Sequence, residues 1–543
     1  MDFFTGIFKR TNGSIDSELI RRLKSSSSFT KLAQSVVFES DKLLAVTASL
    51  TCEVTDESCR STFIADNLYS TLIPQNVEDA KFIEGCRDEH EVISVLKSTR
   101  GNFCGFSLIR ASNKLVLFTD KTAIRPLYYA ITDKYVIFSS QQHEVVNLIG
   151  EDVAIDNDAL LETLTIGYAL GDKTLYAPIN RLNVAEILII DDLGISSKQY
   201  WDRSKIAVKA YENIEREVFR KFEEAVAIRL NEDEPTCFLS GGLDSRVIAT
   251  QLKQNREVVY SFNYGTHHSQ DNEFAQRLAT SLKLHHSEEI LQQLHFPNWS
   301  MLISNSLKNK HKNDVPRKVW SGDGGSVCIG ATYMTEKIQN AVRDGDIAKA
   351  LNLFMQDQLL SPPVNFLKSK YQNYDYFLDL LTRNYSENYG ERGFYNFLIE
   401  NDQKRHLDKH FETMLDHKVD LILPFFDSDL LDLLYTIPTS ELLYHRLYSR
   451  WFELFPIEAR RTPWQTYPGH QPCPLELDDS LDYQWKKKKN FDSTTEDLKI
   501  YKRFKTSLFF SNFDKKKLTI AMFLHKLKIR NYGYLITAFS RIK

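Results

Sequence analysis

The sequence predicts a chain of two main parts, a sheet-rich N-terminal domain and an α/β domain built on a parallel sheet. Three observations lead to this prediction. Short apolar runs separated by Gly, Asn and Asp fill the first 205 or so residues, a helix-spaced apolar pattern covers 211–230, and apolar strands then alternate with amphipathic helices. At 543 residues, 42% apolar and 26% charged, the chain can form more than one sizeable core.

The strand-like runs of the N-terminal part end at turn residues, as is typical of sheets. They are residues 43–47, 103–108, 115–118, 135–138 and 187–190. The pattern then becomes helical, because five apolar residues recur on one helical face: Ile214, Val218, Phe222, Ala225 and Val226. We therefore place the end of the first domain at residue 208.

The second part alternates strands and helices, which predicts a parallel sheet with crossover helices. The expected strands are 236–239, 258–263 and 286–291, and the expected helices are 244–254 and 271–283. Long helical segments should dominate 347–435, and 463–474 is irregular and contains prolines. This domain is expected to cover 209–475, with a basic helical extension over 476–543.

The stretch from Cys237 to Ser245 reads Cys-Phe-Leu-Ser-Gly-Gly-Leu-Asp-Ser, between a predicted strand and a predicted helix. Glycine lets the backbone approach a bulky anion, and N–H groups at a helix start point toward that anion. The order Ser-Gly-Gly-x-Asp-Ser is that of the PP-loop ATP pyrophosphatases, which cleave ATP between its α and β phosphates, and it differs from a Walker loop. An ordinary turn with Asp244 complementing the helix dipole is the alternative.

The composition also bears on the location of the protein and on the state of its cysteines. No apolar run approaches the roughly 18 residues that cross a bilayer, and the start lacks signal-peptide features, so we expect a cytoplasmic protein without a membrane span. The seven cysteines form no Cys-x-x-Cys pair, which indicates reduced and mostly buried thiols.

Charge is distributed unevenly along the chain. The net charge is −4, but residues 481–543 hold 16 Lys and Arg against 5 Asp and Glu, a net charge of +11 that leaves −15 for the remainder. The basic residues include Lys486–Lys489 and Lys515–Lys517. A solvated helical face explains them most simply, and contact with a polyanion or a membrane surface is the alternative.

Further motifs stand in a fixed order on both sides of the predicted boundary. They are Gly101–Phe106, Phe118–Asp120, Arg125–Tyr129, Phe138–Ser140, Tyr260–Gly265, Trp320–Ser326 and Leu423–Asp427. With the Ser-Gly-Gly loop, this set resembles the asparagine synthetase family, including its β-lactam synthetase and lasso-peptide cyclase relatives, over about residues 5–475.

The resemblance implies a fold and an activity. The fold is an α+β N-terminal domain, an Ntn-hydrolase-like αββα sandwich of glutaminase type. An α/β PP-loop synthetase domain, of the adenine nucleotide alpha hydrolase type and with many helices, follows it. The activity is amide formation, in which ATP and Mg²⁺ adenylate a small-molecule or peptide carboxylate and an amine or ammonia displaces AMP.

The resemblance also implies site residues. Ser240, Gly241, Gly242 and Ser245 would hold the phosphates and Asp244 a Mg²⁺. The adenosine pocket would be lined by Leu239, Tyr264, Ser321 and Gly322. Asp323 replaces a glutamate of the family and would orient or deprotonate the attacking amine.

Four departures from the family pattern bear on activity. The nucleophilic cysteine of the glutaminase is replaced by Thr5, and Thr51-Cys52-Glu53 stands where the family has a glutamine-gripping Arg-Leu-Ser, so we expect no glutamine hydrolysis. A second magnesium-binding aspartate is replaced by Ser326. The lysine that should stabilise pyrophosphate is missing from 460–470, where Arg460, Arg461 or His470 would have to supply the positive charge.

Two other functions are compatible with the sequence. One is a PP-loop enzyme that modifies tRNA, supported only by the basic tail. The other is a non-catalytic nucleotide-binding protein, suggested by the altered residues. We expect no nucleic-acid partner and make no prediction of oligomeric state.

Two residue clusters have simpler explanations than a site. The pairs His267-His268 and His285-His286, near Asp271 and Glu273, suggest zinc, but adjacent histidines point in different directions, so we favour structural roles. The aromatic-rich segment 371–395 is expected to be core, with the wall of an acyl-acceptor pocket as the alternative.

Overall fold

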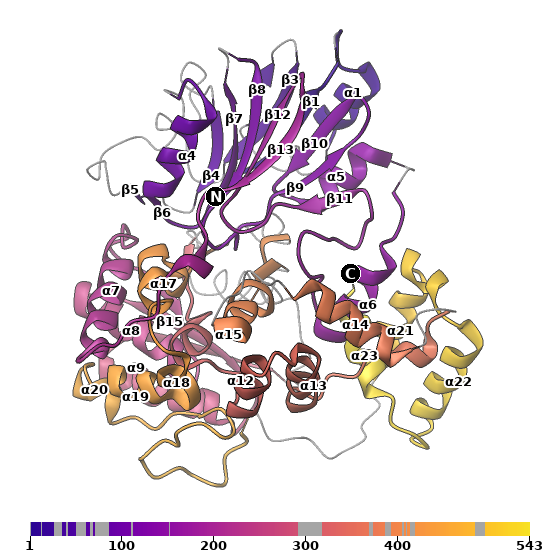
Figure 1. Cartoon of the computed structure of the whole chain (residues 1–543). Coiled ribbons are helices and arrows are strands. Elements are labelled where there is room, and N and C mark those ends of the chain that lie inside the picture. Colours follow the sequence, from indigo (N-terminus) through magenta and orange to yellow (C-terminus); the bar gives the residue numbers. More distant parts are fainter. Residues whose placement is uncertain are drawn as a thin grey trace. The chain divides into compact units, whose positions relative to one another are not determined.

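The computed structural model describes residues 2–11, 13–26, 35–39, 42–49, 61–65, 69–70, 86–109, 112–150, 153–291, 318–368, 373–385, 392–403, 407–408, 410–412, 419–483 and 495–542. The chain divides into two compact units (Figure 1). Unit 1 comprises 1–148, 182–332 and 406–486, and unit 2 comprises 149–181, 333–405 and 487–543. These units cut across the boundaries at 208 and 475, which assumed that each domain is one continuous stretch.

The N-terminal part of unit 1 is a sandwich of two antiparallel sheets. In one sheet the order includes β9 (Tyr128–Ile131), β10 (Tyr135–Ser139), β1 (Asp2–Lys9), β3 (Leu43–Ser49) and β2 (Ser35–Glu39). The other has the order β13 (Gly194–Gln199), β12 (Glu186–Asp191), β8 (Lys114–Thr119), β7 (Phe103–Ile109) and β4 (Ser61–Ala65). All five predicted strand runs are confirmed.

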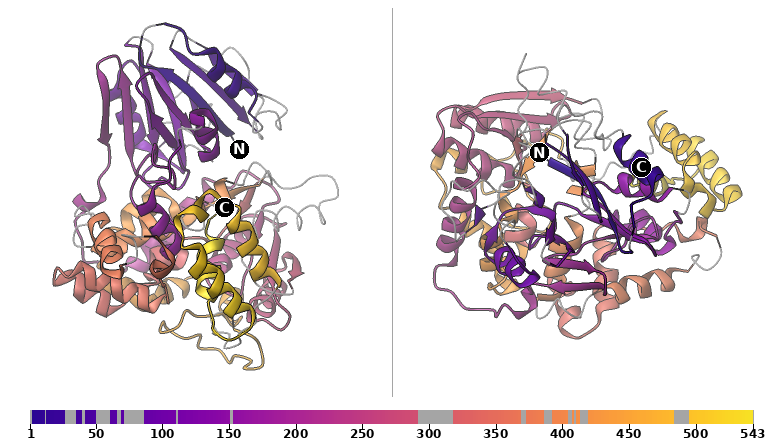
Figure 2. Two further views of the ribbon diagram at one scale, coloured as in Figure 1. Left: turned by 90° about the vertical axis from the view of Figure 1, so that its right-hand side faces the viewer. Right: turned by 90° about the horizontal axis from the view of Figure 1, so that it is seen from above.

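Aromatic side chains fill the space between the two sheets. The Phe106 ring of the second sheet lies 5.1 Å from the Phe4 ring and 5.0 Å from the Phe138 ring, both of the first sheet. Helix α4 (Glu89–Ser98) packs Val92 and Leu96 into the core of the second sheet, and α1 (Ser17–Lys24) contacts β3 of the first. These layers, seen edge-on in Figure 2, are the αββα sandwich that the sequence predicts.

The second part of unit 1 is a parallel sheet with the order β16 (His285–Ile290), β15 (Tyr260–Gly265), β14 (Thr236–Phe238), β17 (Lys318–Trp320) and β18 (Asp420–Ile422). Helices α7 (Ile214–Ala227), α8 (Asp244–Asn255) and α9 (Gln270–Leu282) connect or flank these strands. The predicted strands and helices of this region are confirmed to within two or three residues at each end. Its central strand, β14, leads directly into the Ser-Gly-Gly loop.

The expectation of long helices over 347–435 is wrong in part. The helices there are short, such as α13 (Ile347–Asp357), α14 (Tyr374–Asn384) and α15 (Gly393–Phe397), and the range also contains strand β18. Only three residues of β18 pair with β17, and no local pattern marks so short a strand.

Unit 2 is helical and brings three separate chain segments together. Its α6 (Asn157–Ile166) contacts α14 and also α23 (Gly533–Ser540), and the Arg541 guanidinium donates to the Leu164 carbonyl at 2.8 Å. The prediction that the aromatic segment 371–395 is core is confirmed for Phe377, Phe394 and Tyr395, which are fully buried, but it is wrong for Tyr374, which is 37% exposed. Tyr376 and Tyr385 are half-buried. Tyr371 and Tyr389, like Lys486–Lys489 of the basic tail, lie outside the described residues.

The described cysteines are free thiols: Cys104, Cys237, Cys328 and Cys473 are buried and Cys86 is half-buried, whereas Cys52 and Cys59 lie outside the described residues.

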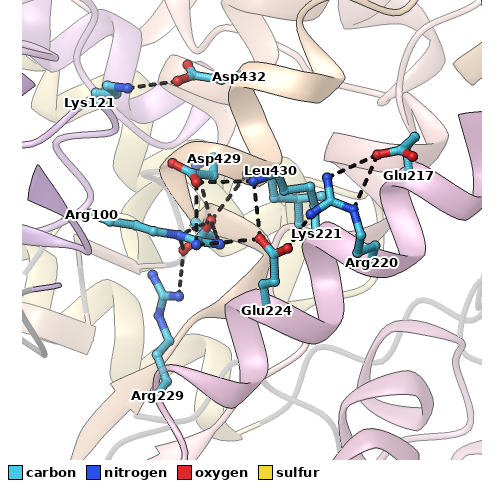
Figure 3. A network of polar contacts seen from close by, with 11 residues as sticks. Arg100, Lys121, Glu217, Arg220, Lys221, Glu224, Arg229, Asp429, Leu430 and Asp432 are labelled. Atoms are coloured by element: carbon cyan, nitrogen blue, oxygen red, sulfur yellow. Dashed lines mark hydrogen bonds and ion pairs between the residues drawn. The ribbon is translucent and has the colours of Figure 1, made fainter. Parts of the chain in front are cut away.

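Buried ion pairs join the sandwich to the parallel sheet within unit 1 (Figure 3). The Asp427 carboxylate lies 2.8 Å from the Arg100 guanidinium and 2.7 Å from that of Arg229. Burial would raise the pKa of Asp427, but the positive charges of Arg229 and Arg100 outweigh it and hold the pKa below its usual value. A second pair, Arg125 with Asp420 at 2.9 Å, is buried in the same way.

We expect Asp427→Asn to destabilise the protein by about 3–5 kcal/mol, because the buried Arg229 guanidinium loses its carboxylate and Arg100 keeps only the longer ion pairs to Asp429 and Glu224. The measurement is the urea midpoint. The control is Arg220→Ala, which removes the solvent-exposed ion pairs of Arg220 to Glu217 and Glu224 on α7 and should cost less than about 1 kcal/mol. Equal decreases of the urea midpoint in the two variants would contradict the conclusion that the buried ion pairs of Asp427 stabilise unit 1.

Candidate nucleotide-binding site

The Ser-Gly-Gly loop, residues 240–243, lies at the carboxyl edge of the parallel sheet between β14 and α8. Tyr264 near the end of β15 and Ser321 after β17 lie at the same edge, because the three strands are parallel. Ligands of open parallel sheets bind at this edge. The structure thus places the sequence-predicted residues of three separate segments around one loop.

Hydroxyl groups close the loop on itself. The Ser240 N–H donates to the Ser245 hydroxyl at 2.9 Å, and the Gly242 N–H donates to the Ser240 hydroxyl at 3.2 Å. The two hydroxyl oxygens lie 3.0 Å apart. The polar groups of the loop therefore converge on a small volume.

Two glycines are required by close backbone contacts. A Cβ on Gly241 would lie 2.8 Å from the Gln270 carbonyl oxygen, and one on Gly322 would lie 2.5 Å from the Ser245 amide nitrogen. The Gly241 N–H also donates to the Asp271 carboxylate at 3.0 Å. Asp271, considered above only as a zinc ligand, thus connects α9 to the loop. Burial raises its pKa.

Asp244 begins α8 and faces Ser326 across the site. Its carboxylate accepts the Ser326 N–H at 2.9 Å and the Ser326 hydroxyl at 2.8 Å. Burial raises the pKa of Asp244 to about 6, although hydrogen bonds from Ser326 and Tyr448 oppose the shift. The nearby Asp323 charge raises it further.

Asp323 follows β17 and accepts the Ser321 hydroxyl at 2.6 Å. Burial raises the pKa of this carboxyl too. A half-buried carboxyl with a raised pKa is suited to accepting a proton from an amine. Asp323 and Asp244 interact electrostatically, so the sequence-predicted acid and metal ligand share one site.

The residues of the predicted site differ in their exposure. Ser240, Gly242, Asp244, Asp323 and Ser326 are partly exposed. The other predicted site residues are buried around them: Leu239, Gly241, Ser245, Tyr264, Ser321 and Gly322. Partly exposed hydroxyl and carboxyl groups therefore lie above a layer of buried residues.

Sequence reasoning missed Arg246 in the first turn of α8. Its guanidinium is fully buried, donates to the carbonyls of Ala459 at 2.9 Å and Pro463 at 2.6 Å, and lies 5.5 Å from the centre of the Trp464 ring. Burial lowers its pKa to about 10. The available signal was an arginine directly before the apolar run Val247-Ile248-Ala249. Arg246 thereby fixes the segment after 459 against the loop.

The candidates for the missing lysine are differently placed. Arg460 pairs with Glu453 at 2.7 Å and donates to the Phe455 carbonyl at 2.9 Å. Burial lowers the pKa of His470 to about 4, so its imidazole is uncharged at neutral pH. Arg461 is exposed. The positive charge of Arg460 is therefore balanced by Glu453, and His470 carries no positive charge at neutral pH.

Residues His285 and His286 contact side chains of the neighbouring strand β15. The His286 Nδ1 atom lies 2.9 Å from the Ser261 hydroxyl, and the His285 ring lies 5.2 Å from the Tyr260 ring. Within the described ranges, no three His, Cys, Asp or Glu side chains are grouped as metal ligands would be.

The position that matches the glutaminase nucleophile lies inside a sheet. Thr5 is in the middle of β1, fully buried, and its hydroxyl lies 2.8 Å from that of Ser139 on β10. The neighbouring Gly6 faces the Phe138 ring so closely that a Cβ would lie 2.2 Å from it. Residues 51–53, in the segment expected to grip glutamine, lie outside the described residues.

Comparisons with known proteins agree with this arrangement. A family model for a glutamine amidotransferase domain matches residues 91–201, and one for asparagine synthase matches residues 217–302. A protein of Methanocaldococcus jannaschii, with the name of a glutamine-hydrolysing asparagine synthetase, is 23% identical over 218 residues. That match covers 39% of this chain and 38% of the relative.

Two solved structures are similar to this chain at 10% identity. One is the allosteric regulatory enzyme of purine biosynthesis, with a TM-score of 0.25, covering 53% of this chain and 80% of that one. The other is glutamine phosphoribosylpyrophosphate amidotransferase from B. subtilis, with a TM-score of 0.24, covering 62% and 93%.

The matches define a glutamine amidotransferase-type domain followed by an asparagine synthase domain. The resemblance to the asparagine synthetase family, indicated by the motifs, is thus supported by matches to two separate parts of the chain, and the chain spans 38% of the length of the Methanocaldococcus jannaschii relative.

We expect Gly322→Ala to destabilise the protein by about 1–3 kcal/mol, since the new methyl would overlap the backbone of Asp244 and Ser245. The measurement is the urea midpoint. Gly242→Ala is the matched control, because its Cβ would have only an ordinary contact, 3.4 Å from the Ser240 hydroxyl. Equal urea midpoints of the two variants would contradict the close contact between the backbone of Gly322 and that of Asp244 and Ser245.

Proposed function

We propose that the protein is an ATP-dependent ligase that adenylates a substrate carboxylate, releases pyrophosphate and forms an amide with an amine or ammonia. The observation that carries the proposal is the loop of 240–243, whose hydroxyls and accessible Gly242 face the carboxyl edge of the sheet beside Asp244. An unactivated carboxylate cannot expel oxide, whereas an acyl-adenylate has AMP as its leaving group.

Phosphate binding is assigned to Ser240, Gly241, Gly242 and Ser245. The loop N–H groups are now satisfied by the loop's own hydroxyls and by Asp271. Phosphate oxygens would take over the bonds that Ser240 and Ser245 make to each other and to the backbone. Leu239, Tyr264, Ser321 and Gly322 would enclose the adenosine from the adjacent strands.

The residues present fit a magnesium ion held mainly by its substrate. Mg²⁺ prefers oxygen ligands and usually takes one or two carboxylates together with phosphate oxygens and water. Asp244 supplies one carboxylate, and Ser326 supplies a neutral hydroxyl where a second acid would stand. The magnesium ion would neutralise negative charge on the departing pyrophosphate, and Asp244 would hold the ion in position.

Asp323 is the residue assigned to the attacking amine. Its hydrogen bond from Ser321 holds the carboxyl in one orientation at the open face, and burial raises its pKa. From there it would accept a proton from the amine as the carbon–nitrogen bond forms.

We propose that the N-terminal sandwich does not hydrolyse glutamine. The Thr5 hydroxyl is buried within a sheet and bonded to Ser139, so it cannot reach a substrate without opening the strand pairs. The amine would then come from free ammonia or from the substrate itself, as in a cyclising or tailoring reaction.

A second candidate is a nucleotide-binding protein without ligase activity. The placement of Arg460 and His470 and the neutral Ser326 favour it, because neither Arg460, which is paired with Glu453, nor the uncharged His470 would offer a free positive charge to the departing pyrophosphate. Binding alone cannot separate the two candidates, whereas turnover can.

With Mg²⁺, ATP and a panel of carboxylates that includes aspartate and glutamate, we expect release of pyrophosphate rather than phosphate. Gly242→Ala should weaken ATP binding at least about tenfold with an unchanged urea midpoint, since only a ligand fills the space beside it. Adenosine affinity is the control and should be retained. ATP binding without pyrophosphate exchange would support the second candidate, and release of phosphate alone would contradict the ligase.

We expect the Mg²⁺ affinity of the protein with a non-hydrolysable ATP analogue to fall about tenfold from pH 7 to pH 5, because Asp244, with a pKa of about 6, must be ionised to bind. The free nucleotide titrated in parallel is the control. Asp244→Asn has no carboxyl group to titrate and should remove this pH dependence. An unaltered pH dependence in the variant would contradict the assignment.

A further inference from the structure

Helix α22 (Lys515–Lys526) and the turn after it expose a dense group of apolar side chains. Ile520, Phe523, Leu527 and Ile529 are 60%, 59%, 50% and 67% exposed. Six of the fifteen large apolar side chains that are exposed in the described ranges fall between 508 and 534. Isolated exposed apolar residues are ordinary, but a cluster of this density indicates a contact surface.

The exposed apolar residues form one stripe along the helix. Ile520, Phe523 and Leu527 recur at intervals of three and four residues, which places them on one face. The opposite face of α22 is already used, because Leu518, Ala521, Met522 and His525 are buried. The stripe is therefore a separate surface and not an exposed part of the core.

Basic side chains stand at both ends of this stripe. Lys516 and Lys517 precede it and are exposed, and Lys526, Lys528 and Arg530 surround its other end. Residues 495–542 hold 11 Lys and Arg against 3 Asp and Glu, a net charge of +8. Asp514 caps the helix by accepting the Lys516 and Lys517 N–H groups, and its carboxylate also lies 3.9 Å from the Lys517 ammonium.

We propose that this α22 surface docks on an anionic phospholipid membrane. Aliphatic and aromatic side chains enter the boundary between headgroups and acyl chains, while long basic side chains reach anionic headgroups. A second copy of the chain is disfavoured, because two surfaces of like charge would face each other. Nucleic acid would not use Ile520, Leu527 or Ile529, which neither stack on bases nor donate hydrogen bonds.

The proposal is one of peripheral contact. No helix in the part of the chain that the structure describes combines the length and apolar character needed to span a bilayer. In Figure 1, α22 is one of the yellow helices of unit 2.

The test is flotation of the full chain with vesicles of phosphatidylcholine that contain roughly one-third phosphatidylserine, against pure phosphatidylcholine. We expect at least about tenfold more bound protein on the anionic vesicles, decreasing with added salt. The double variants Ile520→Asn/Phe523→Asn and Lys516→Glu/Lys517→Glu should each lose this binding. Because all four side chains are exposed, their thermal unfolding should match that of the wild type.

The matched control is Leu193→Asn, which removes an apolar side chain that is 97% exposed at the turn between β12 and β13. It should bind vesicles like the wild type. Equal binding to both vesicle types, or unchanged binding by the Ile520→Asn/Phe523→Asn variant, would overturn the proposal. A wild-type dimer that this variant dissociates, or a preference for an RNA oligomer over the vesicles, would overturn it as well.

Discussion

Unit 1 depends on the segment from Asp420 to Asp427, where buried charges meet close packing. Asp420 and Asp427 hold the sandwich through Arg125 and Arg100, and β18 between them pairs with β17. The Phe425 and Phe426 rings then press on Gly325 and Gly324, where a Cβ would lie within 2.9 Å of them. Because Gly325 also faces the Asp244 carboxylate, one short segment connects the sandwich to the proposed nucleotide site.

The proposed nucleotide site contains several buried carboxyl groups whose ionised form is energetically unfavourable. Burial raises the pKa of Asp244, Asp271 and Asp323, so each ionised carboxyl is less favourable there than in water. Such groups persist where a ligand or metal will compensate them, and perturbed carboxyls are enriched at functional sites. Arg246, the buried cation nearby, donates to backbone carbonyls and stabilises the loop support without neutralising these acids.

Local chemistry explains what the sequence could predict. The strands β14 and β15 are apolar runs bounded by turn residues, and the loop between β14 and α8 is a compact motif, so both could be recognised without tertiary information. Strand β18 could not, because its identity comes from pairing with β17 about a hundred residues earlier. The neutral state of His470 and the pairing of Arg460 with Glu453 also depend on packing that no local pattern reveals.

The segmented make-up of unit 2 has a consequence for biosynthesis. Helix α6 contacts α14 and α23, and α23 lies some 370 residues further along the chain. Contacts between such distant residues carry a large loop-closure entropy and form slowly. During translation, α6 must wait for α23 to be synthesised, so the nascent chain exposes apolar helix surface throughout that interval. Chaperone dependence would therefore originate in unit 2, away from the early-synthesised sandwich.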